Sequence, residues 1–178
     1  MFGCPPDFRN IKTHSSMKTL AEIFYDAIMA DSDVLDAISF ITPTGNEDYA
    51  IKSTCFEVPP GELDNTPLPN IIISDDGFVN SHSTKDVVWE SDEDVVQATV
   101  DIAACSPDEV SVLVAKVRKA IENHICSMYA SGQDTPQLQE GFPTSQGIEW
   151  DWAKPCYFQK IVYQCVTTKF EDDDKENN

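Results

Sequence analysis

The chain has 178 residues, a length that suits a single domain with one hydrophobic core. Its 31 acidic residues outnumber its 12 basic residues, which gives a formal net charge of −19 at pH 7. Such a surface repels phosphate backbones and anionic bilayers, so tight binding to nucleic acid or membrane is not expected. The sequence shows no signal peptide and no run of about 18 apolar residues, so we expect no membrane segment.

Charge and cysteine positions add two constraints. Residues 31–110 carry 18 acidic and 2 basic side chains, a local net charge of −16, whereas residues 1–19 have a net charge of +2. The 6 cysteines are widely separated and lack a secretory context, so we interpret them as reduced thiols.

Residues 1–15 are predicted to form an extended arm. Pro5-Pro6 blocks a helix, and the apolar residues follow neither a helical nor a strand period. Such an arm is either disordered or docked on another subunit. Phe2, Phe8 and Ile11 favour docking, because apolar side chains gain little on a free arm.

A first helix is predicted to begin near Ser16 or Thr19, where Glu22 can complete a capping box with Thr19. Its apolar face consists of Leu20, Ile23, Phe24, Ala27 and Ile28. A further short turn over 33–38 is expected, capped by Ser32 or Asp33.

Several short strands and loops follow. The pattern predicts strands over 49–58, 70–74 and 85–89. Pro-rich residues 59–69 are expected to form a loop, Asp75-Asp76-Gly77 a turn, and 78–84 a further loop. The acidic residues 90–94 are expected to form a solvated hairpin tip.

The central feature is a strand over 95–105 that leads into a long helix ending near Tyr129. Ser106 and Glu109 have capping-box spacing, and Pro107 suits the first helical position. The apolar stripe of this helix consists of Val110, Leu113, Val114, Val117, Ile121, Ile125 and Met128. Because a lone helix is marginal in water, we expect this stripe to pack on the sheet.

The remaining residues complete one domain. Residues 130–147 are predicted to be loop, Trp150 to Trp152 alternates, and 156–170 is a long strand. The acidic residues 171–178 are predicted to be a disordered tail, so the domain covers 16–170. The expected fold class is α+β: a mostly antiparallel sheet of four or five strands with two helices packed on one face.

No pattern of catalytic or metal-binding chemistry is present. His14, His82 and His124 lie in no metal-ligand or nucleophile signature, and no glycine-rich phosphate loop occurs. We therefore expect no catalytic residue, no metal, no cofactor and no enzymatic activity. The aromatic residues near the C-terminus favour a core or subunit contact over a nucleic-acid surface, because few cations accompany them. The candidate subunit or partner contacts are Phe2, Phe8, Ile11, Phe78, Trp89, Trp150 and Trp152.

The order of these elements resembles the tail-terminator (tail-completion, neck-ring) proteins of tailed bacteriophages. Residues 20–28 followed at once by 30–35 are similar to the opening helix and short second turn of that family. Residues 69–73 are similar to its Pro-initiated apolar strand, and 100–106 leading into 114–121 to its strand-plus-helix signature. The resemblance covers roughly residues 17–130, with residues 156–170 fitting the last strand.

This resemblance implies a structural virion protein, made in the host cytoplasm, that forms a homo-oligomeric ring of six or twelve copies in the neck or tail. Its partners would be its own copies and the neighbouring portal, adaptor and tail proteins. DNA would pass through the lumen without specific binding, and no membrane is involved.

Two other classes remain open from the residues alone. An acidic DNA mimic that inhibits a basic nucleic-acid-binding protein would use the same −16 block. An enzyme subunit or accessory domain is the weakest alternative, because no site chemistry supports it.

Overall fold

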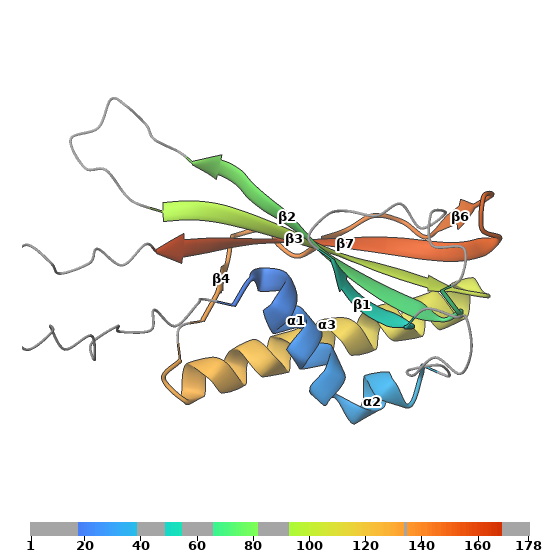
Figure 1. Cartoon of the computed structure of the whole chain (residues 1–178), viewed down its shortest axis with the longest axis horizontal. Helices are drawn as coiled ribbons and strands as arrows, with labels where there is room; N and C mark the ends of the chain where they lie inside the picture. Colours follow the sequence, from blue (N-terminus) through green and yellow to red (C-terminus); the bar gives the residue numbers. More distant parts are fainter. Residues whose placement is uncertain (1–17, 39–48, 55–65, 82–92, 134, 169–178) are drawn as a thin grey trace, which may run out of the picture.

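The computed structural model describes residues 18–38, 49–54, 66–81, 93–133 and 135–168 (Figure 1). Its elements are α1 Leu20–Ala30, α2 Ser32–Leu35, β1 Ile51–Thr54, β2 Asn70–Ser81, β3 Glu93–Ala104, α3 Pro107–Ala130, β4 Gln137–Leu138, β5 Thr144–Ser145, β6 Glu149–Asp151 and β7 Cys156–Thr168. The predicted arm 1–15, the strand 85–89 and the tail 171–178 lie outside these residues.

The fold is α+β, as predicted, with helices and sheet in two layers (Figure 1). The sheet has the order β1-β2-β3-β7-β4, and β5 and β6 also pair with β7. Within the described residues, β1 and β2 form the one parallel pair, and the other pairs are antiparallel. The sheet therefore has seven strands instead of four or five, because short strands form where a loop is predicted over 130–147.

The central strand β3 alternates as its sequence predicts. Ala98, Val100 and Ile102 are buried in the core that the helices cover. Its partners β2 and β7 supply Ile71, Ile73, Ile161 and Tyr163 to the same core. From α3, the predicted residues Val110, Leu113, Val114, Val117 and Ile121 are buried, and Ile125 packs against the core while partly buried. The expected packing of α3 on the sheet is confirmed.

The N-terminal helix pair shows one confirmed cap and one corrected cap. Thr19 and Glu22 form the reciprocal capping box of α1, with the Glu22 carboxylate accepting from the Thr19 N–H at 2.7 Å. The predicted cap of α2, Ser32 or Asp33, is wrong. Asp31 caps this helix instead, and its Oδ1 accepts from the Val34 N–H at 3.0 Å. Because α1 ends at Ala30, the next residue is already extended and serves as the cap of α2.

The predicted turn at Asp75-Asp76-Gly77 is also wrong. Strand β2 continues to Ser81, and its register against β3 shifts between Asp75 and Gly77. Aspartates and a glycine in a strand can mark a β-bulge as well as a turn, and pairing with β3 selects the bulge here. Residues 78–81 of the predicted loop 78–84 are therefore strand, and β3 begins at Glu93 in the segment predicted as a hairpin tip.

Candidate subunit interface

The β6–β7 hairpin (residues 148–157, called the Trp hairpin below) brings two predicted contact residues together. Trp150 of β6 stands opposite Tyr157 of β7, and Glu149 and Asp151 pair with Phe158 and Cys156. Asp151 Oδ1 accepts from the Ala153 N–H at 2.8 Å, which fixes the start of the connecting turn. The hairpin is therefore closed by local hydrogen bonding.

Three aromatic rings gather on this hairpin. The centroids of Trp150 and Tyr157 are 4.7 Å apart with the rings at 65°, and those of Trp150 and Trp152 are 6.0 Å apart at 80°. Both are edge-to-face arrangements, which suit aromatic quadrupoles. Nevertheless 37% of Trp150 and 86% of Trp152 remain exposed. Large exposed aromatic side chains of this kind are enriched at protein interfaces.

The other predicted contact residues are not tested. Phe2, Phe8, Ile11 and Trp89 lie outside the described residues. Phe78 belongs to β2, where it pairs with Val96 of β3, and its side chain is not described. The candidate list missed Tyr157 and the neighbouring Ile148, which is 37% exposed. Tyr157 could have been found from strand pairing, because a four-residue turn places it opposite Trp150.

The two margins of the sheet differ from each other. At one margin the four-residue β1 pairs with β2, and no other partner of β1 occurs among the described residues. At the other margin residues 137–151 run along β7 in three short pieces. Within the described residues, the strand pieces at both margins are short, between two and four residues each.

Polar side chains cross the sheet face opposite the helices. Gln164 Nε2 donates to Gln97 Oε1 at 2.8 Å, and Gln97 Nε2 donates to Asp76 Oδ2 at 2.7 Å. Farther along the same face of β3, beyond Thr99, Asp101 is 2% exposed, and both its carboxylate oxygens lack a hydrogen-bond partner in the described part of the chain. Burial, with a smaller contribution from the charge of Asp76, raises the pKa of Asp101 to about 7.

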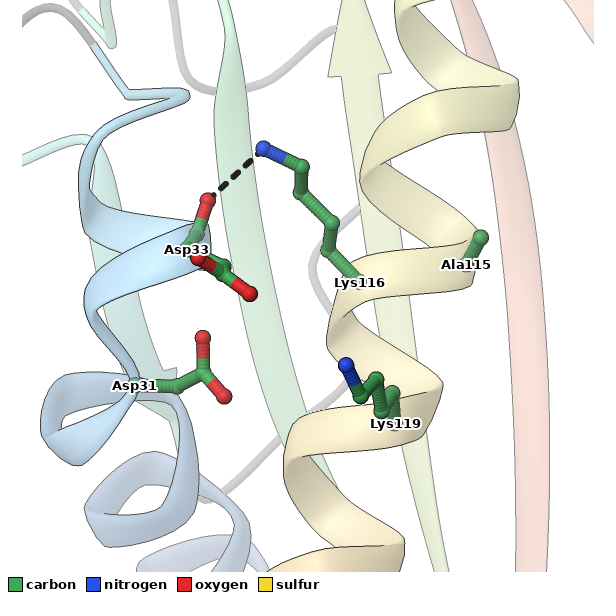
Figure 2. Close-up of a pocket in the computed structure, with 5 residues that line it drawn as sticks. All are labelled: Asp31, Asp33, Ala115, Lys116 and Lys119. Atoms are coloured by element: carbon green, nitrogen blue, oxygen red, sulfur yellow. Dashed lines mark hydrogen bonds between the residues drawn. The ribbon is translucent and has the colours of Figure 1, made fainter.

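A shallow hollow of about 170 Å³ separates α2 from α3. Asp31, Asp33, Ala115, Lys116 and Lys119 line it (Figure 2). Lys116 reaches from α3 to α2 and its Nζ donates to the Asp33 carbonyl oxygen at 2.9 Å. Because two carboxylates and two ammonium groups share the hollow, it presents no net charge to a ligand. We interpret the hollow as part of the contact between α2 and α3 and not as a ligand site.

The described residues contain no cluster of three or more metal-ligating side chains. His124 lies on α3, half-buried, and His14 and His82 lie outside the described residues. The four described cysteines are free thiols: Cys105 and Cys126 are exposed, and Cys156 and Cys165 are buried. Among the helices described, none combines the length and the apolar character needed to cross a bilayer.

Fold and surface together define a two-layer α+β protein whose most conspicuous exposed feature is an aromatic hairpin. No family model and no curated protein matches the chain. Eight chains of solved structures match it. One of them, described as the virion of a native gene transfer agent particle, is 12% identical, with a TM-score of 0.42 over 88% of this chain and 100% of that chain. An identity this low transfers no function.

Proposed function

We propose that this protein is a structural virion component that closes into a homo-oligomeric ring in the head–tail connector or at the tail terminus of a tailed phage. The observation that supports this most is the sequence of elements within one two-layer unit. Helix α1 is followed directly by the short α2, β2 begins after Pro69 as an apolar strand, and β3 leads into α3 through the Ser106 cap. These are the segments that resemble tail-terminator proteins.

The surface of the unit suits ring closure. Cyclic assembly requires two different surfaces on each copy, because each subunit contacts its two neighbours in opposite senses. The sheet has two unlike margins, β1 on one side and residues 137–151 on the other. The exposed Trp hairpin adjoins the second margin and supplies the apolar anchor that stable interfaces contain.

The charge of the chain suits a passage for DNA. A net charge of −19 gives the protein little affinity for phosphates, and each cationic contact in a channel would slow a moving duplex. The ring therefore lets DNA pass without binding it, between the portal or adaptor on one side and the tail on the other. The protein works without a cofactor and without catalysis, in a virion assembled from proteins made in the host cytoplasm.

Electron microscopy of the purified full-length chain, combined with a duplex-DNA binding assay, tests this function. We expect class averages of a closed ring with a central opening, and no retention of duplex DNA at about 0.15 M salt. A monomer or dimer that binds a basic nucleic-acid-binding protein with steep salt dependence would instead identify the acidic DNA mimic. Firm binding to duplex DNA would also contradict the proposed ring.

A further inference from the structure

The Trp hairpin exposes large apolar side chains that its own ring contacts do not cover. Trp152 is 86% exposed even though its ring lies 6.0 Å from that of Trp150. Ile148 is 37% exposed beside them. Because the rings of Trp150 and Trp152 stand at 80° to each other, they offer one aromatic face and one aromatic edge at the same place. Burying such a surface is favourable, and a partner with flat apolar groups would fit it.

The charge beside these rings selects a cationic partner. Glu149 is exposed and Asp151 half-buried within β6, on either side of Trp150 in the sequence, and with Lys154 of the connecting turn they give the hairpin a net charge of −1. Two copies of a chain with a net charge of −19 repel each other unless a basic segment of one meets an acidic surface of the other. Of the two ends of the sequence, residues 1–19 have a net charge of +2, with Arg9, Lys12 and Lys18 against Asp7, whereas residues 171–178 have a net charge of −4.

The same N-terminal arm has the apolar chemistry that aromatic surfaces bind. Pro5-Pro6 favours the extended polyproline conformation, which aromatic-lined sites recognise at low entropic cost. Phe8 can add a further ring, and the Arg9 guanidinium can lie over an indole face. Proline, phenylalanine and arginine within five residues therefore match the rings and carboxylates of the Trp hairpin.

The arm is long enough to reach from the start of α1 along the length of the sheet. The start of α1 lies towards the β4 end of the sheet, and β6 lies at the other end (Figure 1). The eight residue-to-residue steps of β7 from Tyr157 to Cys165 alone span about 26 Å. The twelve residue-to-residue steps from Pro6 to Lys18 reach at most about 43 Å when fully extended. This reach exceeds the span, so distance alone does not distinguish the two copies, and the proposed ring, which places copies side by side, favours the hairpin of the neighbour.

We propose that residues 2–9 of one copy dock on Trp150, Trp152 and Tyr157 of the neighbouring copy. This contact rests on the proposed ring and specifies what ties its subunits together. Pro5 and Pro6 pack on the exposed indoles, and Arg9 approaches Glu149. The arm thereby covers the apolar surface that the hairpin exposes and offsets part of the repulsion between acidic subunits.

Site-specific photo-crosslinking of the full-length chain tests the contact. The photoreactive residue p-benzoylphenylalanine replaces Phe8, and crosslinked peptides are mapped by mass spectrometry after irradiation. We expect a species of twice the 19.8 kDa chain mass whose crosslinks lie within residues 148–157. Trp152→Ala should lower its yield about ten-fold or more, as removal of an interface anchor does. Tyr129→Ala is the matched control, because Tyr129 is 80% exposed on α3, away from the hairpin, and its loss should leave the yield unchanged.

Two charge-reversal variants distinguish a specific effect of the arm from a general effect of net charge. Arg9→Glu should lower the yield, whereas Lys175→Glu makes the same change in the C-terminal tail and should not. Crosslinks within a single chain, crosslinks to another surface, or a yield that Trp152→Ala does not change would each overturn the proposed contact. Hairpin-to-hairpin contact between two copies would show as crosslinks that map away from residues 148–157.

Native mass spectrometry of the same samples distinguishes failure of the contact from failure of the ring. Rings whose arms crosslink elsewhere would refute the arm contact and leave the proposed function standing. Arm-to-hairpin crosslinks in an assembly that stops at dimers would support the contact and refute the ring. Monomers without crosslinked pairs would refute both.

Discussion

At the residue scale, Asp101 is a buried carboxyl group whose ionisation opposes folding at neutral pH. It lies on the central strand β3, opposite Ile72 of β2 and Lys160 of β7. Lys52 of β1 stands on the same row of the sheet, beyond Ile72, and Asp76 of β2 lies close enough to add to the shift of its pKa. Burial favours the neutral acid, so the pKa of Asp101 rises from 3.8 to about 7 on folding.

Replacing Asp101 by Asn should therefore change how stability depends on pH. Because the folded chain holds this proton more tightly than the unfolded chain, the stability due to protonated Asp101 is complete below about pH 4. It is lost as pH rises through about 7. The free energy of unfolding of Asp101→Asn relative to wild type should grow by about 3 kcal/mol between pH 5 and pH 8. Urea titrations at both values measure it, with the exposed Glu140→Gln as a control for loss of one surface charge. A difference that stays constant with pH would contradict the assignment.

Tyr163 carries a second polar atom in the core. Its hydroxyl is buried without a hydrogen-bond partner among the described residues, and burial raises its pKa above the ordinary value of 10.0. The ring itself packs on Phe24 with the centroids 4.6 Å apart.

We expect the ring of Tyr163 to stabilise the fold and its hydroxyl to oppose it. Tyr163→Phe should leave the free energy of unfolding unchanged or raise it by about 1 kcal/mol, because an unpaired buried hydroxyl costs solvation. Phe24→Ala should lower it by about 3–5 kcal/mol, because a cavity replaces the ring. Chemical denaturation of both variants checks the pair, and a loss above about 1 kcal/mol for Tyr163→Phe would show that the hydroxyl is paired in solution.

At the scale of single elements, α3 has a side-chain cap at its N-terminus and a glycine cap at its C-terminus. Ser106 Oγ accepts from the Glu109 N–H at 3.3 Å, and Pro107 occupies the first turn. At the other end Gly132 adopts φ +71°, while Gln133 N–H donates to the Met128 carbonyl and Gly132 N–H to the Tyr129 carbonyl, both at 3.1 Å. This is a Schellman motif, which requires a left-handed residue after the cap.

A pair of glycine variants isolates that backbone requirement. An added Cβ would meet no atom within 4 Å at either Gly132 or Gly147, but only Gly132 has a positive φ. Gly132→Ala should lower the free energy of unfolding by about 1–2 kcal/mol. Gly147→Ala should leave it unchanged or raise it by about 0.4–1 kcal/mol. Equal effects of the two substitutions in thermal denaturation would contradict the left-handed cap.

The elements that local signals define could be predicted from the sequence. The strand–helix unit of β3 and α3, the Thr19 capping box and the face of β7 bearing Ile161 and Tyr163 all follow from periodicity and capping residues. The bulge in β2 and the strands β4 and β5 could not be predicted, because pairing with β3 and β7 creates them. Two-residue strands leave no period in a sequence.

The candidate interface could likewise be predicted only in part. Trp150 and Trp152 could be recognised as core or contact residues, and not as a nucleic-acid surface, because few cations accompany the aromatic residues near the C-terminus. Their edge-to-face packing, and the distance of the hairpin from the start of α1, depend on how the strands pair. The unlike margins of the sheet likewise emerge only once β1 is found parallel to β2 and residues 137–151 are found along β7.

At the scale of the whole molecule, two properties work against each other. A charge of −19 keeps copies apart, and exposed aromatic surface draws them together. A ring reconciles the two when contact is confined to the sheet margins, the arm and the Trp hairpin, and the remaining acidic surface stays in solvent. In the proposed ring, the same acidic surface would leave a DNA duplex free to move through the lumen.

Native mass spectrometry of the full-length chain, alone and with candidate portal and tail proteins, tests the proposed ring most directly. The account predicts one dominant assembly of six or twelve times the 19.8 kDa chain mass. A single-chain mass under every one of these conditions would contradict it.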